Sequence, residues 1–223
     1  MIEIDKLLTI NELSDINALI SNARWQSGAH SAGENAEKQK HNQEMDQSCE
    51  SWEKINSLAV SRLFNHPEFQ RTALPNKVSA AFISRYTSGM HYGQHVDNPV
   101  MGTPGALYRS DIACTIFLSD PADYEGGELN IHTRFGPVKV KLDAGCAVVY
   151  PASSIHEVLP VTSGERVVCA LWAQSLVADA HKREILAELD DARAALQLRL
   201  PEAKVTHSID HTYMNLIRLW TTL

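Results

Sequence analysis

The chain has 223 residues, the length of one large domain or of one domain with an appendage. Hydrophobic residues make up 44% and charged residues 21%, which excludes the disordered and fibrous classes. The net charge is −7 without a basic cluster and no apolar run has the length of a membrane span, so we expect no nucleic-acid partner and no membrane partner. The four cysteines form no C-x-x-C pair and the N-terminal residues lack the pattern of a signal peptide, so we expect a cytoplasmic location.

Helical patterns dominate from Thr9 to about Asn76. Thr9 and Glu12 form a capping-box pattern ahead of apolar residues at helical spacing, which predicts a first helix. A second apolar stripe, from Trp52 to Leu63, predicts another amphipathic helix. The polar stretch between them, residues 26–51, is interpreted either as an active-site cover or as a disordered segment.

Strand-like segments follow from about residue 77 to residue 175. They are short, rich in β-branched and aromatic residues, and separated by Gly, Pro, Asp and Ser. Because they recur about every ten residues without helical patterns between them, an antiparallel sandwich or jelly roll is favoured over a βαβ sheet.

The pattern returns to helix from about Ala178. Pro201 is expected to end one helix, and Asp210 to cap a short terminal helix. The predicted fold class is therefore mostly β with flanking helices (α+β), with a double-stranded β-helix (jelly-roll) core at about 77–175. The apolar face around Ile217 and Trp220 leaves a homodimer open.

The segment that ends in His95-Val-Asp97 carries the clearest chemistry. In an extended strand the side chains of His95 and Asp97 point to the same face, so they can bind one metal ion together. A third ligand must come from elsewhere, and His156 begins a later predicted strand. Two histidines and one carboxylate form the facial triad of non-haem Fe(II) oxygenases, which leaves open positions for a co-substrate and dioxygen. Taken singly, each of these residues is more often structural.

Arg166 follows His156 by ten residues. If a three-residue hairpin loop ends at left-handed Gly164, Arg166 points into the same interior as His156, whereas a two-residue turn places it on the opposite face. A guanidinium there can bind the far carboxylate of a metal-chelated dicarboxylate. The alternative is that Arg166 pairs with a surface acid such as Glu157 or Glu165.

Together with the segment EGGEL at 125–129, these motifs resemble the Fe(II)/2-oxoglutarate dioxygenases of the prolyl-hydroxylase branch. The closest likeness is to the bacterial PKHD-type hydroxylases, named for their prolyl/lysyl hydroxylase domain. It covers nearly the whole chain, including Trp25, Gly28 and the Lys40-x-Asn-Gln segment. The resemblance implies that residues 1–177 form the dioxygenase domain and that residues 178–223 form a C-terminal helical extension.

The resemblance also implies the roles of particular residues. The implied Fe(II) ligands are His95, Asp97 and His156. Arg166 would bind the C5 carboxylate of 2-oxoglutarate, with Tyr86 placed to hydrogen-bond this co-substrate and Trp172 placed to line its pocket.

The implied activity is hydroxylation of an unactivated C–H bond, with dioxygen consumed and succinate and CO2 released. The substrate is unidentified, either a peptidyl prolyl or lysyl group or a siderophore-like small molecule, and L-ascorbate (vitamin C) is implied as a reductant. The alternative is a non-catalytic jelly-roll module that binds a metal or an acidic ligand. Residues 26–51 and the loop 98–109 are expected to shape the cavity mouth, while His91 and Tyr92 either contact the substrate or lie at its rim.

Overall fold

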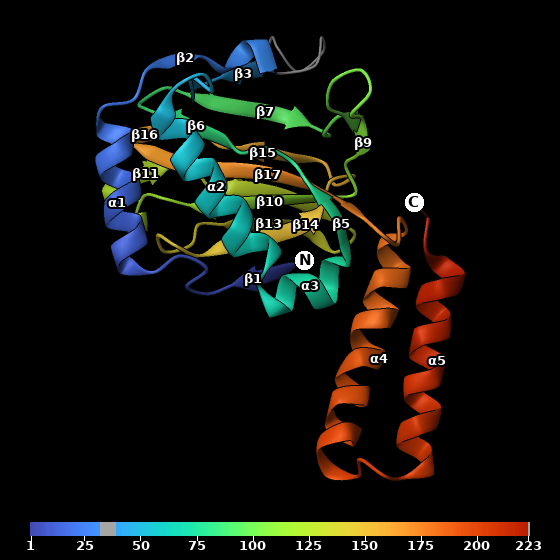
Figure 1. The fold of residues 1–223 in the computed structure, drawn as a ribbon. Coiled ribbons are helices and arrows are strands. Elements are labelled where there is room, and N and C mark those ends of the chain that lie inside the picture. Colours follow the sequence, from blue (N-terminus) through green and yellow to red (C-terminus); the bar gives the residue numbers. More distant parts are fainter. Residues whose placement is uncertain (32–38, 223) are drawn as a thin grey trace.

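Two antiparallel β-sheets pack against each other in the computed structural model, which describes residues 1–31 and 39–222 (Figure 1). The larger sheet has the strand order β1-β14-β10-β17-β6-β4-β2, with β5 also paired to β17. Its strands are β1 (Ile2–Ile4), β2 (Trp25–Ser27), β4 (Gln43–Met45), β5 (Pro75–Val78), β6 (Phe82–Tyr86), β10 (Ile112–Phe117), β14 (Ala147–Pro151) and β17 (Arg166–Ser175).

The smaller sheet has the order β13-β12-β15-β7-β3. Its strands are β3 (Lys40–His41), β7 (His91–His95), β12 (Leu129–Thr133), β13 (Gly136–Val140) and β15 (His156–Val158). Two further pairs are formed by β8 (Val100–Met101) with β9 (Tyr108–Arg109) and by β11 (Tyr124–Gly126) with β16 (Val161–Gly164). The expected jelly-roll architecture of the core is confirmed.

Three helices cover the outer face of the larger sheet (Figure 1). They are α1 (Ile10–Ser21), α2 (Glu50–Phe64) and α3 (Pro67–Ala73), and short 3-10 segments occur at Gly28–Ser31 and Pro121–Asp123. The predicted capping box is present at α1, where Thr9 accepts from the Glu12 backbone N–H and the Glu12 side chain accepts from that of Thr9.

Strand β10 shows how one segment serves two cores. Ile112, Cys114 and Ile116 pack toward the helices, while Ala113 and Phe117 alternate with them and pack between the sheets. Because both faces are covered, every residue of β10 is buried. The inter-sheet core surrounds the functional cavity described below.

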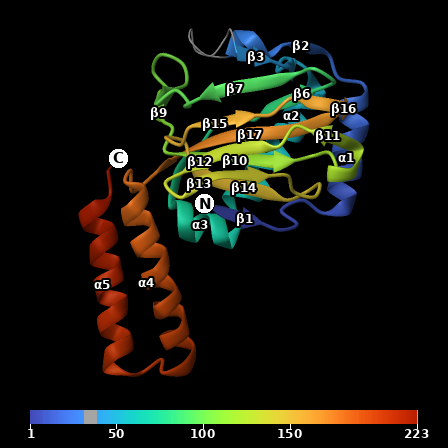
Figure 2. The ribbon, with the colours of Figure 1, turned by 180° about the vertical axis from the view of Figure 1, so that it is seen from behind.

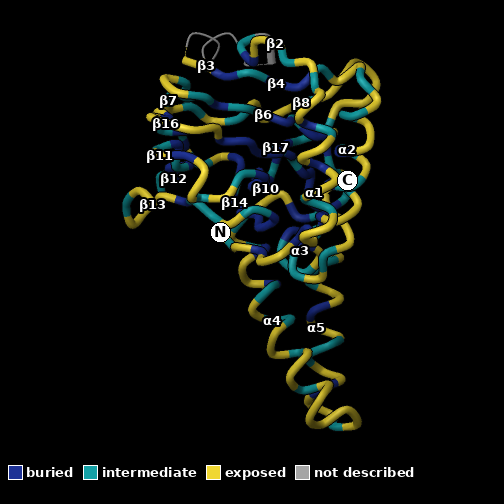
Figure 3. The backbone as a smooth tube through the Cα atoms, turned by 90° about the vertical axis from the view of Figure 1, so that its left-hand side faces the viewer, coloured by how far each residue is buried: buried dark blue, intermediate teal, exposed yellow. Residues whose placement is uncertain are grey.

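A helical hairpin of α4 (Ala180–Arg199) and α5 (Lys204–Trp220) projects from the sheets (Figure 2). Much of it is exposed, in contrast to the sheet strands (Figure 3). The apolar face around Ile217 and Trp220 packs within the chain against α4 and Val177 and is partly buried there, and the homodimer stays a prediction. The division of the chain at residue 177 stays a prediction.

One predicted helix start is wrong. Helix α5 begins at Lys204, with Ala203 as its N-cap, so Asp210 lies inside the helix. The Asp210 carboxylate instead accepts from Arg193 of α4 at 2.9 Å and from Gln197 at 3.1 Å. Among the described helices, none is both long and apolar enough to cross a membrane.

Candidate active site

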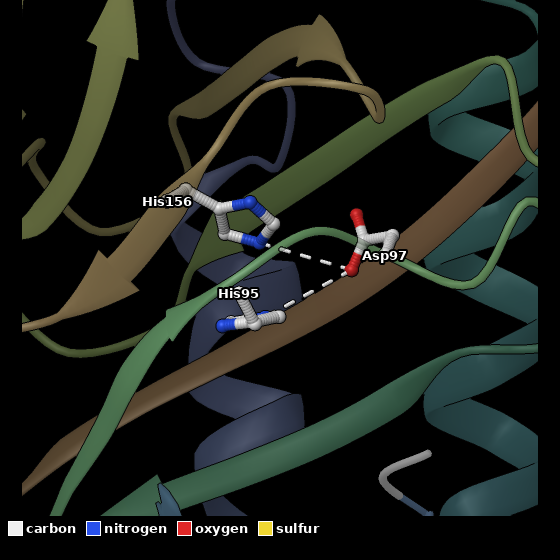
Figure 4. A group of neighbouring side chains, drawn as sticks. All are labelled: His95, Asp97 and His156. Atoms are coloured by element: carbon white, nitrogen blue, oxygen red, sulfur yellow. Dashed lines mark ion pairs between the residues drawn. The ribbon is translucent and has the colours of Figure 1, made fainter. Parts of the chain in front are cut away.

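Three side chains that can bind a metal ion meet between the two sheets (Figure 4). His95 is the last residue of β7 and His156 the first of β15, and the two residues are directly paired in the antiparallel register. Asp97 lies just beyond the end of β7, so the expected strand does not extend to it. Asp97 Oδ1 is nevertheless 4.0 Å from His95 Nε2 and 3.7 Å from His156 Nε2.

Backbone carbonyls fix the orientation of both imidazoles. His95 Nδ1 lies 2.8 Å from the Gly93 carbonyl oxygen, and His156 Nδ1 lies 3.0 Å from that of Ser154. Because a carbonyl only accepts, each Nδ1 carries the proton and donates it. The two Nε2 atoms are thereby left as lone-pair donors directed at the same point, which is the arrangement that metal-binding histidines require.

Burial dominates the electrostatics of this cluster. Desolvation, assisted by the nearby His156, lowers the pKa of His95 to about 4. Burial raises the pKa of Asp97, against the opposing influences of His156, the Trp172 indole N–H and Lys40. A neutral His95 and a carboxylate whose charged form is disfavoured by burial both favour a bound cation, because a metal ion supplies positive charge directly at the carboxylate.

Arg166 is a buried cation at the inner end of the same space. It begins β17, pairs with Tyr86 of β6, and is only 1% exposed. Its guanidinium carbon lies 5.0 Å from the ring centre of Tyr86 and 5.7 Å from that of Phe117, and within the described part of the chain its Nε and Nη1 atoms make no hydrogen bond. Unpaired donors on a buried charge are costly, so the arrangement fits a carboxylate ligand.

The alternative partners of Arg166 are occupied elsewhere. Glu165 lies 3.8 Å from Arg85, and Glu157 accepts from Asn130 at 2.8 Å. The surface ion pair considered for Arg166 is therefore wrong.

The predicted hairpin before Arg166 is also wrong. Gly164 has the expected positive φ of +76°, but β16 pairs with β11 rather than with the strand that Arg166 begins. Arg166 faces inward because β17 pairs with β6 and β10 in the middle of the larger sheet. The correct orientation thus has a different structural cause.

A single cavity of about 580 Å³ contains all six expected site residues. They are His95, Asp97, His156, Arg166, Tyr86 and Trp172. The polar stretch that follows residue 26 contributes Lys40, Glu44 and Gln47 to the cavity wall, and the loop 98–109 contributes several more residues, including Asn98, Met101 and Tyr108. Residues 32–38 of the expected cover lie outside the described part of the chain.

Sequence reasoning left Tyr92 undecided and missed Tyr150. Tyr92 stacks on His95, with ring centres 3.6 Å apart and planes at 15°, and Tyr150 meets the His156 ring edge-on at 5.2 Å. A bulge in β7 shifts the register between Tyr92 and His95 and brings them to the same side. His91 contacts His41 instead, and it is not among the described residues that line the cavity.

Comparison with known proteins places this site in a family. Residues 81–174 match the 2OG-Fe(II) oxygenase superfamily. The chain is 46% identical to a PKHD-type hydroxylase of Thioalkalivibrio sulfidiphilus, an alignment that covers 99% of this chain and 98% of that protein. It is 43% identical to a PKHD-type hydroxylase of an Azoarcus species, over 99% and 98% of the two chains.

The chain belongs to the PKHD-type hydroxylases. This PKHD-type hydroxylase is an enzyme, a 2-oxoglutarate-dependent dioxygenase, and the non-catalytic alternative is not favoured.

Solved structures support the fold of this PKHD-type hydroxylase. A prolyl-4-hydroxylase from Pseudomonas putida superposes with a TM-score of 0.52 at 20% identity, covering 78% of this chain and 91% of that chain. HygX from Streptomyces hygroscopicus, with nickel and 2-oxoglutarate bound, gives a TM-score of 0.55 at 11% identity, over 79% and 83% of the chains. At these identities the likeness concerns the fold alone.

Proposed function

We propose that His95, Asp97 and His156 hold Fe(II) and that Arg166 binds the C5 carboxylate of 2-oxoglutarate. The observation that carries this proposal is that one cavity contains both a His-Asp-His cluster with free Nε2 atoms and a buried guanidinium with unused donors. A dicarboxylate that reaches from the metal to Arg166 would satisfy both ends.

The chain's own residues supply binding, orientation and exclusion of water. When bound, Fe(II) and 2-oxoglutarate supply the oxidising chemistry, with dioxygen consumed and succinate and CO2 released as the substrate is hydroxylated. His95, Asp97 and His156 would hold the ion as a facial triad, a ligand set that leaves positions for a co-substrate and dioxygen. Tyr86 lies beside the guanidinium and would hydrogen-bond the co-substrate, while Trp172 lines the cavity and its indole N–H favours the charged form of Asp97.

The substrate approaches, in this proposal, through the mouth formed by residues 40–47 and 98–109. We propose a peptidyl prolyl or lysyl group or a siderophore-like small molecule as the hydroxylated substrate. A peptide and a small organic molecule each occur in a structure of this fold, the peptide fragment with a Trichoplax adhaerens prolyl hydroxylase and hygromycin B with HygX. Ascorbate as a reductant is proposed from the family resemblance alone.

The test begins with the visible absorption spectrum of the protein mixed with Fe(II) and 2-oxoglutarate under nitrogen. A weak charge-transfer band is expected because the keto acid chelates the iron. Asp97→Ala should abolish both the band and succinate formation. A matched control is His132→Gln, which disrupts a His–carboxylate pair with Glu157 (3.5 Å) outside the cavity and should leave both unchanged. Full succinate formation by Asp97→Ala would falsify the proposed ligand set.

A further inference from the structure

The EGGEL motif packs directly behind Arg166. Gly127 has φ of +66°, and a Cβ atom there would lie 3.0 Å from Arg166 Cδ and 3.2 Å from Tyr124 Cε2. A larger residue would therefore push the two side chains apart, and the positive φ also favours glycine. The motif thus brings the Tyr124 ring and the Arg166 side chain against the same glycine.

The pair of strands β11 and β16 fixes Tyr124 in this position. Tyr124 pairs with Gly164, where a Cβ atom would lie 2.0 Å from the Asp123 carbonyl oxygen and 2.7 Å from Tyr124 Cα. On the other side, Lys141 Nζ donates to the Tyr124 carbonyl oxygen at 2.7 Å and lies 4.0 Å from the centre of its ring. The ring is therefore held between Lys141 and the interior.

The hydroxyl group of Tyr124 has an unusual setting. Tyr124 Oη is buried and makes no hydrogen bond to any of the described residues, as is true of Arg166 Nε and Nη1. Burial raises the pKa of Tyr124, and the Arg166 charge and its hydrogen-bonding capacity act in the opposite direction. Arg166 lines the cavity, whereas Tyr124 is not among the described residues that do so.

We propose that Tyr124 is a positioning residue for Arg166, with its hydroxyl holding the guanidinium from the side that faces away from the cavity. The remaining N–H donors then face the C5 carboxylate of the co-substrate. The inference rests on the proposed role of Arg166. Without the hydroxyl, the ring faces of Tyr86 and Phe117 still lie beside the guanidinium, but these contacts do not fix its rotation. Preorganised donors bind more tightly because less freedom is lost on binding.

The test measures binding at equilibrium rather than turnover. The full-length protein is loaded with Mn(II) as a redox-stable ion, and calorimetry gives the Kd of 2-oxoglutarate and of 2-oxopentanoate, in which a methyl group replaces the C5 carboxylate. Tyr124→Phe should raise the Kd of 2-oxoglutarate about tenfold, the effect of one hydrogen bond to a charged group. The Kd of 2-oxopentanoate should not change.

Two further variants separate the possible outcomes. Tyr213→Phe is a matched control, because Tyr213 is also a buried tyrosine beside an arginine, 4.5 Å from Arg193, but lies in the helical hairpin. It should bind both keto acids as the wild type does. Arg166→Ala should remove most of the preference for 2-oxoglutarate.

An unchanged Kd in Tyr124→Phe, or an equal weakening of both keto acids, overturns the role of Tyr124 while leaving that of Arg166 intact. If Arg166→Ala keeps the wild-type preference, the proposed co-substrate site itself fails, and the inference fails with it.

Discussion

The ion pair between Lys40 and Glu44 provides a sharp test of how the cavity wall is held together. Lys40 lies in β3 at the edge of the smaller sheet and Glu44 in β4 of the larger sheet, so the pair joins the two sheets where the chain crosses between them. Lys40 Nζ and Glu44 Oε1 are 2.5 Å apart, and the side chains are only 9% and 8% exposed.

The expected energy follows from this burial. At an effective dielectric constant of about 20, two unit charges at this separation attract by about 6–7 kcal/mol. Desolvation of each ion offsets several kcal/mol of this attraction, but removing one partner takes the attraction away from a charge that stays largely buried, at a cost of about 3–5 kcal/mol. We therefore expect Lys40→Met and Glu44→Gln each to lower the free energy of unfolding by about 3 kcal/mol.

The chain offers a matched control with the same residue types and spacing. Lys54 and Glu50 on α2 are also four residues apart, with their charged atoms at 2.7 Å, but they are 58% and 79% exposed. Two double-mutant cycles, measured by urea unfolding at about pH 7, should give a coupling energy of about 2–3 kcal/mol for the buried pair and about 0.3–0.5 kcal/mol for the exposed pair. Equal coupling energies in the two cycles would refute the reasoning, since other contacts of each residue cancel in a cycle.

Three further perturbations test the site and its supports. Burial lowers the pKa of His95 to about 4, so between about pH 4 and pH 6.5 the unfolded metal-free chain binds more protons at His95 than the folded chain does. The free energy of unfolding should therefore fall by about 3 kcal/mol through this residue as the pH falls from about 6.5 to about 4. The raised pKa of Asp97 changes the free energy of unfolding with pH in the opposite sense, so the contribution of His95 is isolated by comparing urea unfolding of the wild type and His95→Gln across this pH range. Parallel pH profiles of the two proteins would contradict the contribution expected from His95. Trp172→Phe removes the indole N–H that favours the charged form of Asp97 and should raise the Kd for Mn(II) about tenfold in a metal titration. An unchanged Kd would show that this N–H does not contribute to metal binding. Gly164→Ala would place a Cβ 2.0 Å from a backbone oxygen at a φ of +76° and should lower the free energy of unfolding, followed by thermal unfolding, by at least about 1–3 kcal/mol. The control Gly89→Ala has a similar φ of +85° but open space around the added Cβ, so it should lower the free energy of unfolding less. Equal losses in the two variants would argue against the steric clash.

The residues of the inner site, His95, Asp97, His156 and Arg166, were predictable because their types and spacing indicate their chemistry. The sequence predicts one functional set from a histidine and an aspartate one residue apart, a later histidine and an arginine ten residues beyond it, and in the structure these residues line one cavity. The strands that carry them were predictable for a related reason, because β-branched residues between turn residues have few alternatives to a strand.

The errors have in common that a partner distant in sequence decides the local structure. Residues 161–164 pair with β11, about 40 residues earlier, and this pairing replaces the expected hairpin. Asp210 lies inside α5 because Arg193 of the facing helix binds its carboxylate. Tyr92 joins His95 only through a bulge, which alternation along the strand does not reveal.

The inner and outer parts of the cavity also differ in what builds them, which explains why the co-substrate follows from the sequence and the substrate does not. His95, His156 and Arg166 occupy strands that pair on both sides within the two sheets, so register and packing fix their directions. The mouth consists instead of the sheet-edge segment 40–47 and the loop 98–109, whose side chains face the cavity without a repeating pattern that indicates a ligand. Since function depends on the site rather than on the fold, the choice of substrate in this hydroxylase must be sought in these two segments, where a substitution can alter the mouth without disturbing the metal cluster.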